Sequence, residues 1–391
     1  MAIENKVSQS KIMFINFLSY FILMTAAPAL QADSIMFQAN LERNGVYEAE
    51  GPKSEPVLAW TFDAGAAVFS TPLVYSGIVY FVDIDGGVYA LNQSDGTLLW
   101  ERSLGGQPSF QIAIDEDVLL VGRLFSEEGD GSYLIAIDRK SGEERWKFET
   151  NDRSGMDSPT IYNDMVFLAS MSNFIFSLDL ADGKEIWRHP ISGGDRQPLI
   201  SNGVLYFQDV SQTIYALSPE SGELQWSFTP PTDRQWHFST PAIGGEYIYA
   251  LISGEESSVL SKINKINGEL VSEFPIDYSS MSSVSLAENV AFFGDDGEGH
   301  AGAHGNMNAI NVKNGELLWR FETEGFVRGG AAIAGDIVYF GSHDHYLYAV
   351  DRHTGEMKWR YETGAGIASA PAVVDGRVYF GSIDGHVYVL E

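Results

Sequence analysis

The chain has 391 residues, of which 45% are apolar and 20% are charged, so it can build a large hydrophobic core and is not disordered. Its formal net charge of −29 at pH 7 repels phosphate backbones, so nucleic acid is not an expected partner. Solubility alone accounts for such a charge, and binding of cations or basic protein surfaces is the alternative. The sequence contains no cysteine, so we expect no disulfide, thiolate catalysis, cysteine-bound zinc or lipid on an N-terminal cysteine.

Residues 1–32 have the organisation of a secretory signal peptide. A lysine-containing start precedes an apolar run over 12–24, and small residues follow before Asp33. The apolar run is short for a membrane span, and no second hydrophobic stretch follows it. We expect cleavage after Ala29 or Ala32 and export to the periplasm or the medium, as a monomer without a transmembrane span in the mature chain. An uncleaved anchor is the alternative.

Beyond a lead-in segment over 33–56, the chain is predicted to consist of repeated units. A glycine followed four residues later by tryptophan recurs with a spacing of about 39 to 47 residues, and each unit holds four strand-like segments separated by turn residues. A period of this length with strand content predicts the blades of a β-propeller. The repeated residues are Gly96, Gly142, Gly183, Gly222, Gly268, Gly315 and Gly355 with Trp60, Trp100, Trp146, Trp187, Trp226, Trp319 and Trp359.

These repeated glycines and tryptophans are predicted to be structural. In "DRHTG" (351–355) the glycine ends a short loop between the third and fourth strands, where a positive φ would disfavour any residue with a Cβ. The tryptophan follows on the fourth, outer strand, and we expect its ring to pack against the neighbouring blade. The fifth unit (239–274) is the weakest, because it keeps Gly268 but has Ser272 where the tryptophan belongs.

The two ends of the repeat region are incomplete in complementary ways. The last unit begins at 368 and contains only three strands, whereas 57–65 is a fourth strand that carries Trp60 and has no unit before it. We expect the N-terminal strand to complete the C-terminal blade, which leaves no open sheet edge in the ring. The predicted fold is therefore all-β: an eight-bladed β-propeller of four-stranded antiparallel blades, in one domain over 57–391.

The repeat motif also resembles a known family. "AIDRKSGEERW" (136–146) and "AVDRHTGEMKW" (349–359) are similar to the A-x-D-x-x-[TS]-G-x-x-x-W repeat of the quinoprotein-type, or PQQ-like, β-propellers, where PQQ is pyrroloquinoline quinone. The likeness covers roughly residues 37–391. The family has a catalytic branch of PQQ-dependent alcohol and glucose dehydrogenases. Its non-catalytic branch includes the BamB-type lipoproteins, which scaffold outer-membrane β-barrel assembly.

The resemblance implies features of each branch that can be compared with this chain. The alcohol dehydrogenases are generally longer and hold the quinone under a vicinal disulfide, above a tryptophan and beside calcium. This chain has no cysteine for that disulfide and short turns in most units. BamB-type proteins resemble it in length, although they are usually tethered through a lipidated cysteine. We therefore expect an exported, non-enzymatic scaffold that binds proteins and needs no cofactor, with a PQQ- and Ca²⁺-dependent oxidoreductase as the alternative.

The sixth unit carries a long polar insertion, "GDDGEGHAGAHGNMN" (294–308). Its carboxylates suit Ca²⁺, and its imidazoles suit Zn²⁺ or another transition metal. The predicted metal ligands are Asp295, Asp296, Glu298, His300 and His304. A solvated polar loop without a metal is the alternative, and a metal-binding surface protein built around this loop is a third reading of the function.

Other binding candidates lie in the connections between blades, which share one face of a propeller with the turns between second and third strands. Trp236 is out of register with the repeat, next to Arg234 and His237, and could stack on a planar ligand or anchor a partner peptide; packing within its loop is the alternative. A charged set in equivalent positions could line the mouth of the channel or simply form hydrogen bonds within itself. That set is Arg153, Asp157, Asp195, Arg196 and Arg328.

Overall fold

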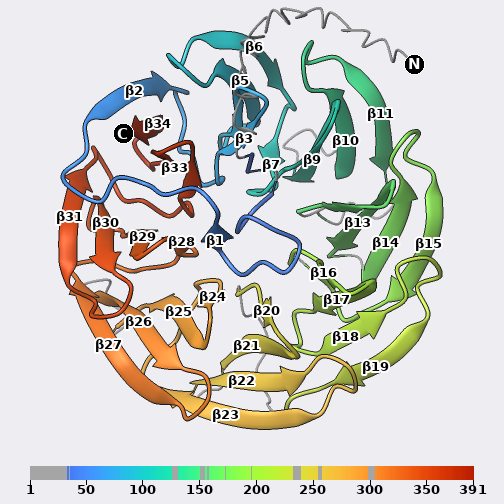
Figure 1. The fold of residues 1–391 in the computed structure, drawn as a ribbon. Coiled ribbons are helices and arrows are strands. Elements are labelled where there is room, and N and C mark those ends of the chain that lie inside the picture. The colour runs from blue at the N-terminus through green and yellow to red at the C-terminus, as the bar shows by residue number, and fades with distance from the viewer. Residues whose placement is uncertain are drawn as a thin grey trace, which may run out of the picture. The chain divides into compact units, whose positions relative to one another are not determined.

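Eight antiparallel blades surround one axis in the computed structural model, as the repeat predicts (Figure 1). Each blade has four antiparallel strands; β7 (Gln107–Pro108) is an additional strand in blade 2, and β1 (Val46–Tyr47) adds a parallel strand to blade 7. The model describes residues 33–34, 36–125, 131–149, 155, 158–171, 173–194, 196–231, 239–253, 258–297 and 304–391. The predicted signal peptide over 1–32 lies outside these residues, and Ala32–Glu391 form one compact unit. Over the described ranges the secondary structure is β-strand and turn, and no helix is long and apolar enough to cross a membrane.

Blades 1 to 4 follow one another in chain order, and within each blade the strands run from the axis outwards. Blade 1 contains β3 (Leu73–Tyr75), β4 (Ile78–Val82), β5 (Gly87–Asn92) and β6 (Leu98–Ser103). Blade 2 contains β7 (Gln107–Pro108), β8 (Ala113–Asp115), β9 (Val118–Phe125), β10 (Tyr133–Asp138) and β11 (Glu144–Glu149). Blade 3 contains β12 (Thr160–Tyr162), β13 (Met165–Ser170), β14 (Phe174–Asp179) and β15 (Glu185–Pro190). Blade 4 contains β16 (Leu199–Ser201), β17 (Val204–Gln208), β18 (Ile214–Leu217) and β19 (Leu224–Phe228).

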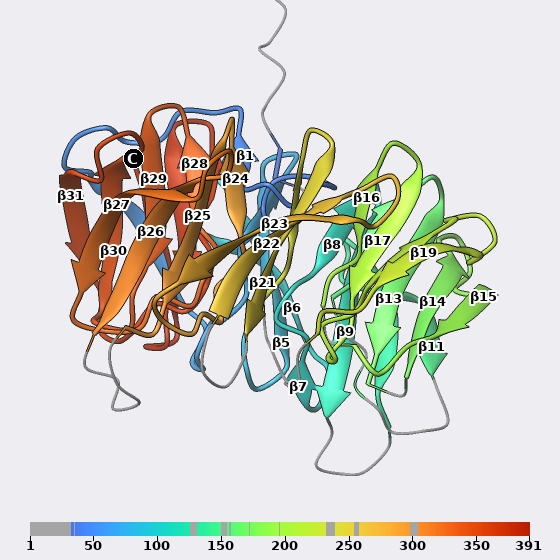
Figure 2. The same ribbon diagram turned by 90° about the horizontal axis from the view of Figure 1, so that it is seen from below.

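Blades 5 to 8 complete the ring, and seen from the side their strands run between its two faces (Figure 2). Blade 5 contains β20 (Ala242–Gly244), β21 (Tyr247–Ser253), β22 (Ser258–Asn264) and β23 (Leu270–Ile276). Blade 6 contains β24 (Ser285–Ala287), β25 (Val290–Asp295), β26 (Gly305–Asn311) and β27 (Glu316–Thr323). Blade 7 contains β28 (Ala332–Ala334), β29 (Ile337–Gly341), β30 (Tyr346–Asp351) and β31 (Met357–Glu362). Blade 8 contains β32 (Ala372–Val374), β33 (Arg377–Gly381), β34 (His386–Leu390) and β2 (Leu58–Asp63).

The predicted closure of the ring is confirmed. Strand β2 pairs antiparallel with β34, and Trp60 lies opposite Val389 in that pairing. The N-terminal strand is thus the outer strand of the C-terminal blade. Both ends of the repeat region are locked by main-chain hydrogen bonds, so the ring has no open seam between its first and last blades.

Six of the seven repeated tryptophans join neighbouring blades, as predicted: the indole Nε1 of each donates to a main-chain carbonyl of the next blade at 2.8–3.1 Å. The seventh, Trp359, donates at 2.8 Å to the carbonyl of Pro52 in the lead-in segment. The repeated glycines have φ between 68° and 76°. At six of them an added Cβ would lie 2.4–3.0 Å from the nearest atom of a tryptophan ring. Two independent features therefore require glycine at each of these positions: the positive φ, and the aromatic ring that leaves no space for a Cβ.

In the fifth unit, Phe274 replaces the missing tryptophan. Phe274 lies two residues after Ser272 on β23, so both side chains project from the same side of the strand. Phe274 is buried, and an added Cβ at Gly315 would lie 2.4 Å from its ring. Phe274 thus occupies the position that tryptophan has in the other blades, without the indole hydrogen bond.

A tryptophan-to-phenylalanine change should therefore isolate the value of that hydrogen bond. In Trp187→Phe, the carbonyl of Pro219 loses an Nε1 donor at 2.8 Å in a buried contact. We expect the free energy of unfolding to fall by about 1–3 kcal/mol, because a buried acceptor is left unpaired and some packing is lost. Urea unfolding of Trp187→Phe and wild type checks this, and unchanged stability would mean that packing alone joins the blades.

The lead-in segment contacts all eight blades from inside the ring. It lies across the centre of the ring in Figure 1, and we call residues 34 and 36–47 the axial plug. Its strand β1 (Val46–Tyr47) pairs in parallel with β28 of blade 7. Each of the other seven blades is also contacted by the plug, through the pairs Ser34 and Val74, Met36 and Ala113, Arg43 and Thr160, Leu41 and Ile200, Glu42 and Ile243, Asn44 and Leu286, and Tyr47 and Pro371.

Candidate functional site

The axial plug is fixed by buried polar groups rather than by apolar packing alone. Arg43 is 1% exposed; its Nη1 donates to the Phe37 carbonyl at 2.7 Å and its Nη2 to Thr160 Oγ1 at 2.8 Å. Burial lowers the pKa of the Arg43 guanidinium to about 9, so the group is still cationic at pH 7. Gln38 Nε2 donates to the Val284 carbonyl at 2.8 Å. These bonds tie the plug to opposite sides of the ring.

The plug closes one end of a cavity on the ring axis, which we call the axial cavity. It has a volume of about 430 Å³, and every connection between blades contributes to its wall. Phe37 of the plug lines it together with Phe69, Phe110, Met171 and Met281. Its polar lining residues are Gln107, Gln111, Ser158, Arg196, Gln197, Thr240, Ser283 and Arg328. The cavity is therefore mainly apolar, with two cationic side chains.

Two of the predicted binding-face residues, Arg196 and Arg328, line this same cavity. Arg196 is 7% exposed. Arg328 donates from Nε and Nη2 to the two carboxylate oxygens of Asp296, each at 2.9 Å, and its guanidinium lies 4.1 Å from the ring centroid of Phe326. The structure thus joins a predicted channel residue to a predicted metal ligand. No sequence pattern indicates this pair, because Asp296 follows β25 within blade 6 and Arg328 lies 32 residues later, in the connection from blade 6 to blade 7.

Asp295, the other described carboxylate of the insertion, closes the base of its hairpin. Its Oδ1 accepts from the Gly297 N–H at 2.9 Å and from Asn306 Nδ2 at 2.7 Å, and its Oδ2 accepts from Asn308 Nδ2 at 2.7 Å. Both described carboxylates of the predicted metal site are therefore bound by protein donors. His304 is exposed, Glu298 and His300 lie outside the described residues, and the metal site stays a prediction.

The buried Asp295 carboxyl is expected to make the stability of the protein depend on pH. Burial raises the pKa of its carboxyl, and the hydrogen bonds from Asn308 and Asn306 oppose that shift. Because its pKa is higher in the folded state than the unfolded value of about 3.9, the protonated Asp295 carboxyl favours folding. This contribution to the free energy of unfolding is complete below the unfolded pKa and is lost as the pH rises through the folded pKa.

We expect Asp295→Asn to remove this part of the pH dependence. Compared with wild type, its free energy of unfolding should be lower overall, because an amide places a donor against donors, but should fall less between pH 3 and 6. Urea unfolding at several pH values measures both curves. Parallel curves would show that the carboxyl titrates alike in the folded and unfolded states.

Six of the predicted binding residues cannot be placed. These are Arg153, Asp157, Asp195, Arg234, Trp236 and His237, which lie outside the described residues. Their predicted roles stay predictions. Among the residues that the structure does describe, no three histidine or carboxylate side chains come together as a metal-binding group.

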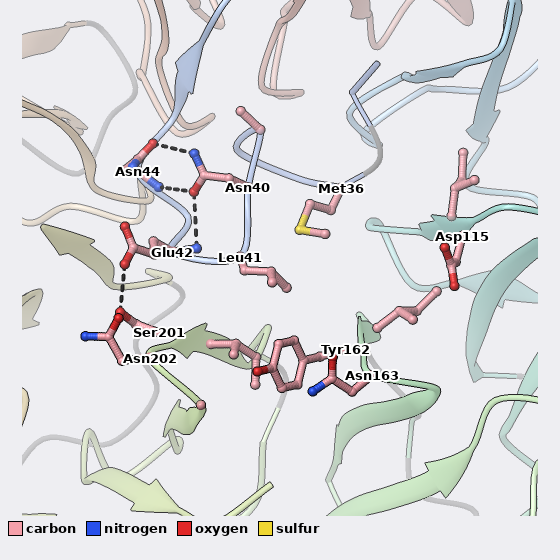
Figure 3. A pocket seen from close by; sticks show the side chains of 15 residues that line it. Met36, Asn40, Leu41, Glu42, Asn44, Asp115, Tyr162, Asn163, Ser201 and Asn202 are labelled. Atoms are coloured by element: carbon pink, nitrogen blue, oxygen red, sulfur yellow. Dashed lines mark hydrogen bonds between the residues drawn. The ribbon is translucent and has the colours of Figure 1, made fainter. Parts of the chain in front are cut away.

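A second cavity, of about 790 Å³, lies where the plug meets blades 2, 3 and 4 (Figure 3). The plug contributes Asn40, Glu42 and Asn44, and the blades contribute the ends of innermost strands, such as Tyr162, and the turns that follow them, such as Asn163. Asn40 Nδ2 donates to Asn44 Oδ1 at 2.7 Å, and Ser201 Oγ donates to Glu42 Oε1 at 2.7 Å. Polar groups of the plug are thus paired here with one another and with blade 4. Sequence reasoning missed this cavity, because the lead-in segment carries no repeat signal.

Fold, blade repeat and axial cavity together define the class of this protein as a PQQ-like β-propeller. The chain belongs to the family described as outer membrane protein assembly factor BamB, whose model matches residues 25–146, 129–293 and 303–391. The family resemblance seen in the repeat motif is thereby confirmed.

Individual relatives are distant. The chain is 22% identical to outer membrane protein assembly factor BamB of Yersinia pestis over 239 residues, which cover 59% of each chain. It is 28% identical to quinohemoprotein alcohol dehydrogenase ADH-IIG of Pseudomonas putida over 157 residues, which cover 35% of this chain and 22% of that enzyme. The chain thus spans less than two thirds of the length of either relative.

Solved structures from both branches share the fold. BamB from Moraxella catarrhalis is 19% identical with a TM-score of 0.70, and the match covers 86% of this chain and all of that one. Quinohemoprotein alcohol dehydrogenase from Comamonas testosteroni is 16% identical with a TM-score of 0.76, and covers 92% of this chain and 80% of that one. At these identities the likeness concerns the fold alone, so it does not choose between the branches.

Proposed function

We propose that the protein is a non-enzymatic scaffold of the bacterial envelope, which binds other proteins during the assembly of outer-membrane proteins. Membership of the BamB-described family supports this function. The structural observation that carries it is the axial plug, which occupies the centre of the ring with the chain's own residues and contacts all eight blades. The result is a stiff platform whose two faces carry short turns for binding.

The residues that line the axial cavity also bear on the alternative function, a PQQ- and Ca²⁺-dependent oxidoreductase. The fold family implies PQQ with Ca²⁺, and Ca²⁺ in proteins is held largely by carboxylate and carbonyl oxygens. Among the described lining residues there are two arginines and no carboxylate or tryptophan. These residues do not fit a calcium-bound quinone of the kind that the resemblance implies, so we assign no catalytic step to the cavity.

The proposed function can be tested in cells. Deleting the gene should lower the amount of folded β-barrel proteins in the outer membrane, and the wild-type gene should restore it. Unchanged β-barrel levels would contradict the assembly function. Separately, purified protein should show no stoichiometric binding when titrated with PQQ in the presence of Ca²⁺. Calcium-dependent binding at a ratio of one to one would favour the oxidoreductase instead.

A further inference from the structure

The innermost strands of the blades present main-chain N–H groups to the axis in a regular way. In five blades the middle residue of this strand donates its N–H to a carbonyl of the axial plug at 2.7–3.1 Å; these residues are Val74, Ile200, Ile243, Leu286 and Ile333. Ile161 is the middle residue of β12 in blade 3, and it lies opposite Val166 as Ile200 lies opposite Leu205. Because the two hairpins share this register, the N–H of Ile161 also points to the axis and not to β13.

The main chain of the axial plug leaves the edge of the blades at blade 3. Met36 bridges to blade 2, and the next plug residue bonded to an innermost strand through its main chain is Leu41, at blade 4. Between them Gln38 and Ala39 have φ of 54° and 70°, a left-handed conformation that residues with a Cβ rarely adopt and that is concentrated at functional sites. Within the described part of the chain, the N–H of Ile161 therefore has no acceptor.

The second cavity occupies the place that the plug leaves open. Ile161 lines it, and Met36, Leu41 and Tyr162 give it an apolar wall (Figure 3). Its volume of about 790 Å³ is within the range of about 300–1,000 Å³ that is typical of ligand pockets. A short stretch of extended chain fits in this volume and brings a carbonyl to the free N–H.

Asp115 makes one end of this cavity negative (Figure 3). It lies on β8, which is side by side with β12, so a short extended segment reaches both its carboxylate and the N–H of Ile161. Among the described residues, no hydrogen bond or ion pair engages the Asp115 carboxylate, whereas Glu42 accepts from Ser201, which is itself bonded by Lys265. No lysine, arginine or histidine is among the described residues that line the cavity. A cationic group is therefore favoured beside Asp115.

We propose that the second cavity binds an extended segment of a partner protein that carries a lysine or arginine. A carbonyl of the segment accepts from the N–H of Ile161, as plug carbonyls do in other blades. The cationic side chain pairs with Asp115, and neighbouring apolar side chains pack against Met36 and Tyr162. The inference rests on the proposed protein-binding function and names the chemical class of segment that is bound.

Hydrogen exchange of the full-length protein, measured residue by residue, tests the open edge at blade 3. In the free protein the protection factor of the Ile161 amide should be at least about tenfold lower than that of the Ile200 amide, which is bonded to the Leu41 carbonyl. Acetyl-Leu-Lys-Leu-amide should raise protection at Ile161 and leave Ile200 unchanged. Equal protection of the two amides in the free protein would overturn the inference, as would a saturating peptide without effect on Ile161.

A second peptide and two variants test the contact with Asp115. The peptide has norleucine in place of lysine and so lacks only the ammonium group. We expect the lysine peptide to bind about fivefold or more tightly, and the ratio to fall towards one in Asp115→Asn. Asp117→Asn is the matched control and should keep the ratio, because Asp117 pairs with Lys140 in the turn after β8 and does not line the cavity. Thermal unfolding of each variant confirms that it is folded.

An equal fall of the ratio in both variants would assign the preference to the overall negative charge and overturn the contact with Asp115. Acetyl-lysine-amide binding as tightly as the tripeptide would indicate a site for small cations and overturn the peptide assignment. Absence of binding by both tripeptides at millimolar concentration would overturn the inference as a whole. The proposed function is tested separately by the outer-membrane β-barrel levels, so a failed peptide experiment with an intact assembly phenotype rejects only this binding site.

Discussion

Removal of residues 33–47 is expected to destabilise the ring by on the order of 3 kcal/mol or more. The burial of Phe37 and Tyr47, each worth about 1.5–3 kcal/mol, would be lost, together with hydrogen bonds to the innermost strands of several blades. Water would enter the ring and expose the apolar walls of the axis. Urea unfolding measures the loss, and binding of a fluorescent hydrophobic dye to the truncated protein reports the exposed surface.

A synthetic peptide of residues 33–48 provides the control for this truncation. Added in trans, it should raise the unfolding midpoint of the truncated protein and displace the dye, because its contacts are made within one short segment. A peptide of the same composition in scrambled order should do neither. A truncated protein as stable as wild type would show that the eight blades hold the ring without the plug.

The second large effect is expected at the glycine that faces Trp187. Gly222 has φ of 68°, and an added Cβ would lie 2.5 Å from the indole ring of Trp187. Gly222→Ala should therefore lower the free energy of unfolding by about 2–5 kcal/mol, of which about 1–2 arises from the left-handed backbone and the rest from the displaced ring. Chemical denaturation measures the total, and the near-ultraviolet circular dichroism of the tryptophans reports the displacement.

Gly203 separates these two costs. It has φ of 73°, but an added Cβ would meet no atom within 4 Å. Gly203→Ala should therefore cost only the backbone part, about 1–2 kcal/mol, and leave the tryptophan signal unchanged. If the two alanine variants were equally destabilised, the contact between glycine and tryptophan would contribute nothing to blade packing beyond its backbone requirement.

The repeat could be predicted from the sequence because its signals are local. Strand alternation, turn residues and the spacing from glycine to tryptophan all lie within one unit, and each recurs. Ring closure followed from the same register, because Trp60 marks 57–65 as a fourth strand without a unit of its own. The role of Phe274 was not predicted. Residues two apart lie on the same side of a strand, but only the structure shows that an aromatic ring packs against Gly315 and that Phe274 supplies it.

The candidate site was predicted only in part. The positions of Arg196 and Arg328 in the connections between blades placed them at one mouth of the channel, and both do line the axial cavity. The pairing of Arg328 with Asp296, one of the predicted metal ligands, was not predicted. The pair joins the turn after β25 to the connection that leaves blade 6, and the path of that connection depends on the position of blade 7, which sequence spacing does not encode.

The sequence by itself determined the number of blades, the closure of the ring and all the residues that join blades except Phe274. It could do so because the strand and turn signals lie within each unit, and the orphan strand 57–65 and the incomplete last unit carry the same register. Only the tertiary structure decided that the lead-in segment fills the axis, that Arg43 is buried there and that Phe37 closes the axial cavity. The physical reason is that these contacts join residues far apart in the chain. These contacts form only when the closed ring brings all eight blades around the lead-in segment, and no local pattern in that segment indicates which residues they involve.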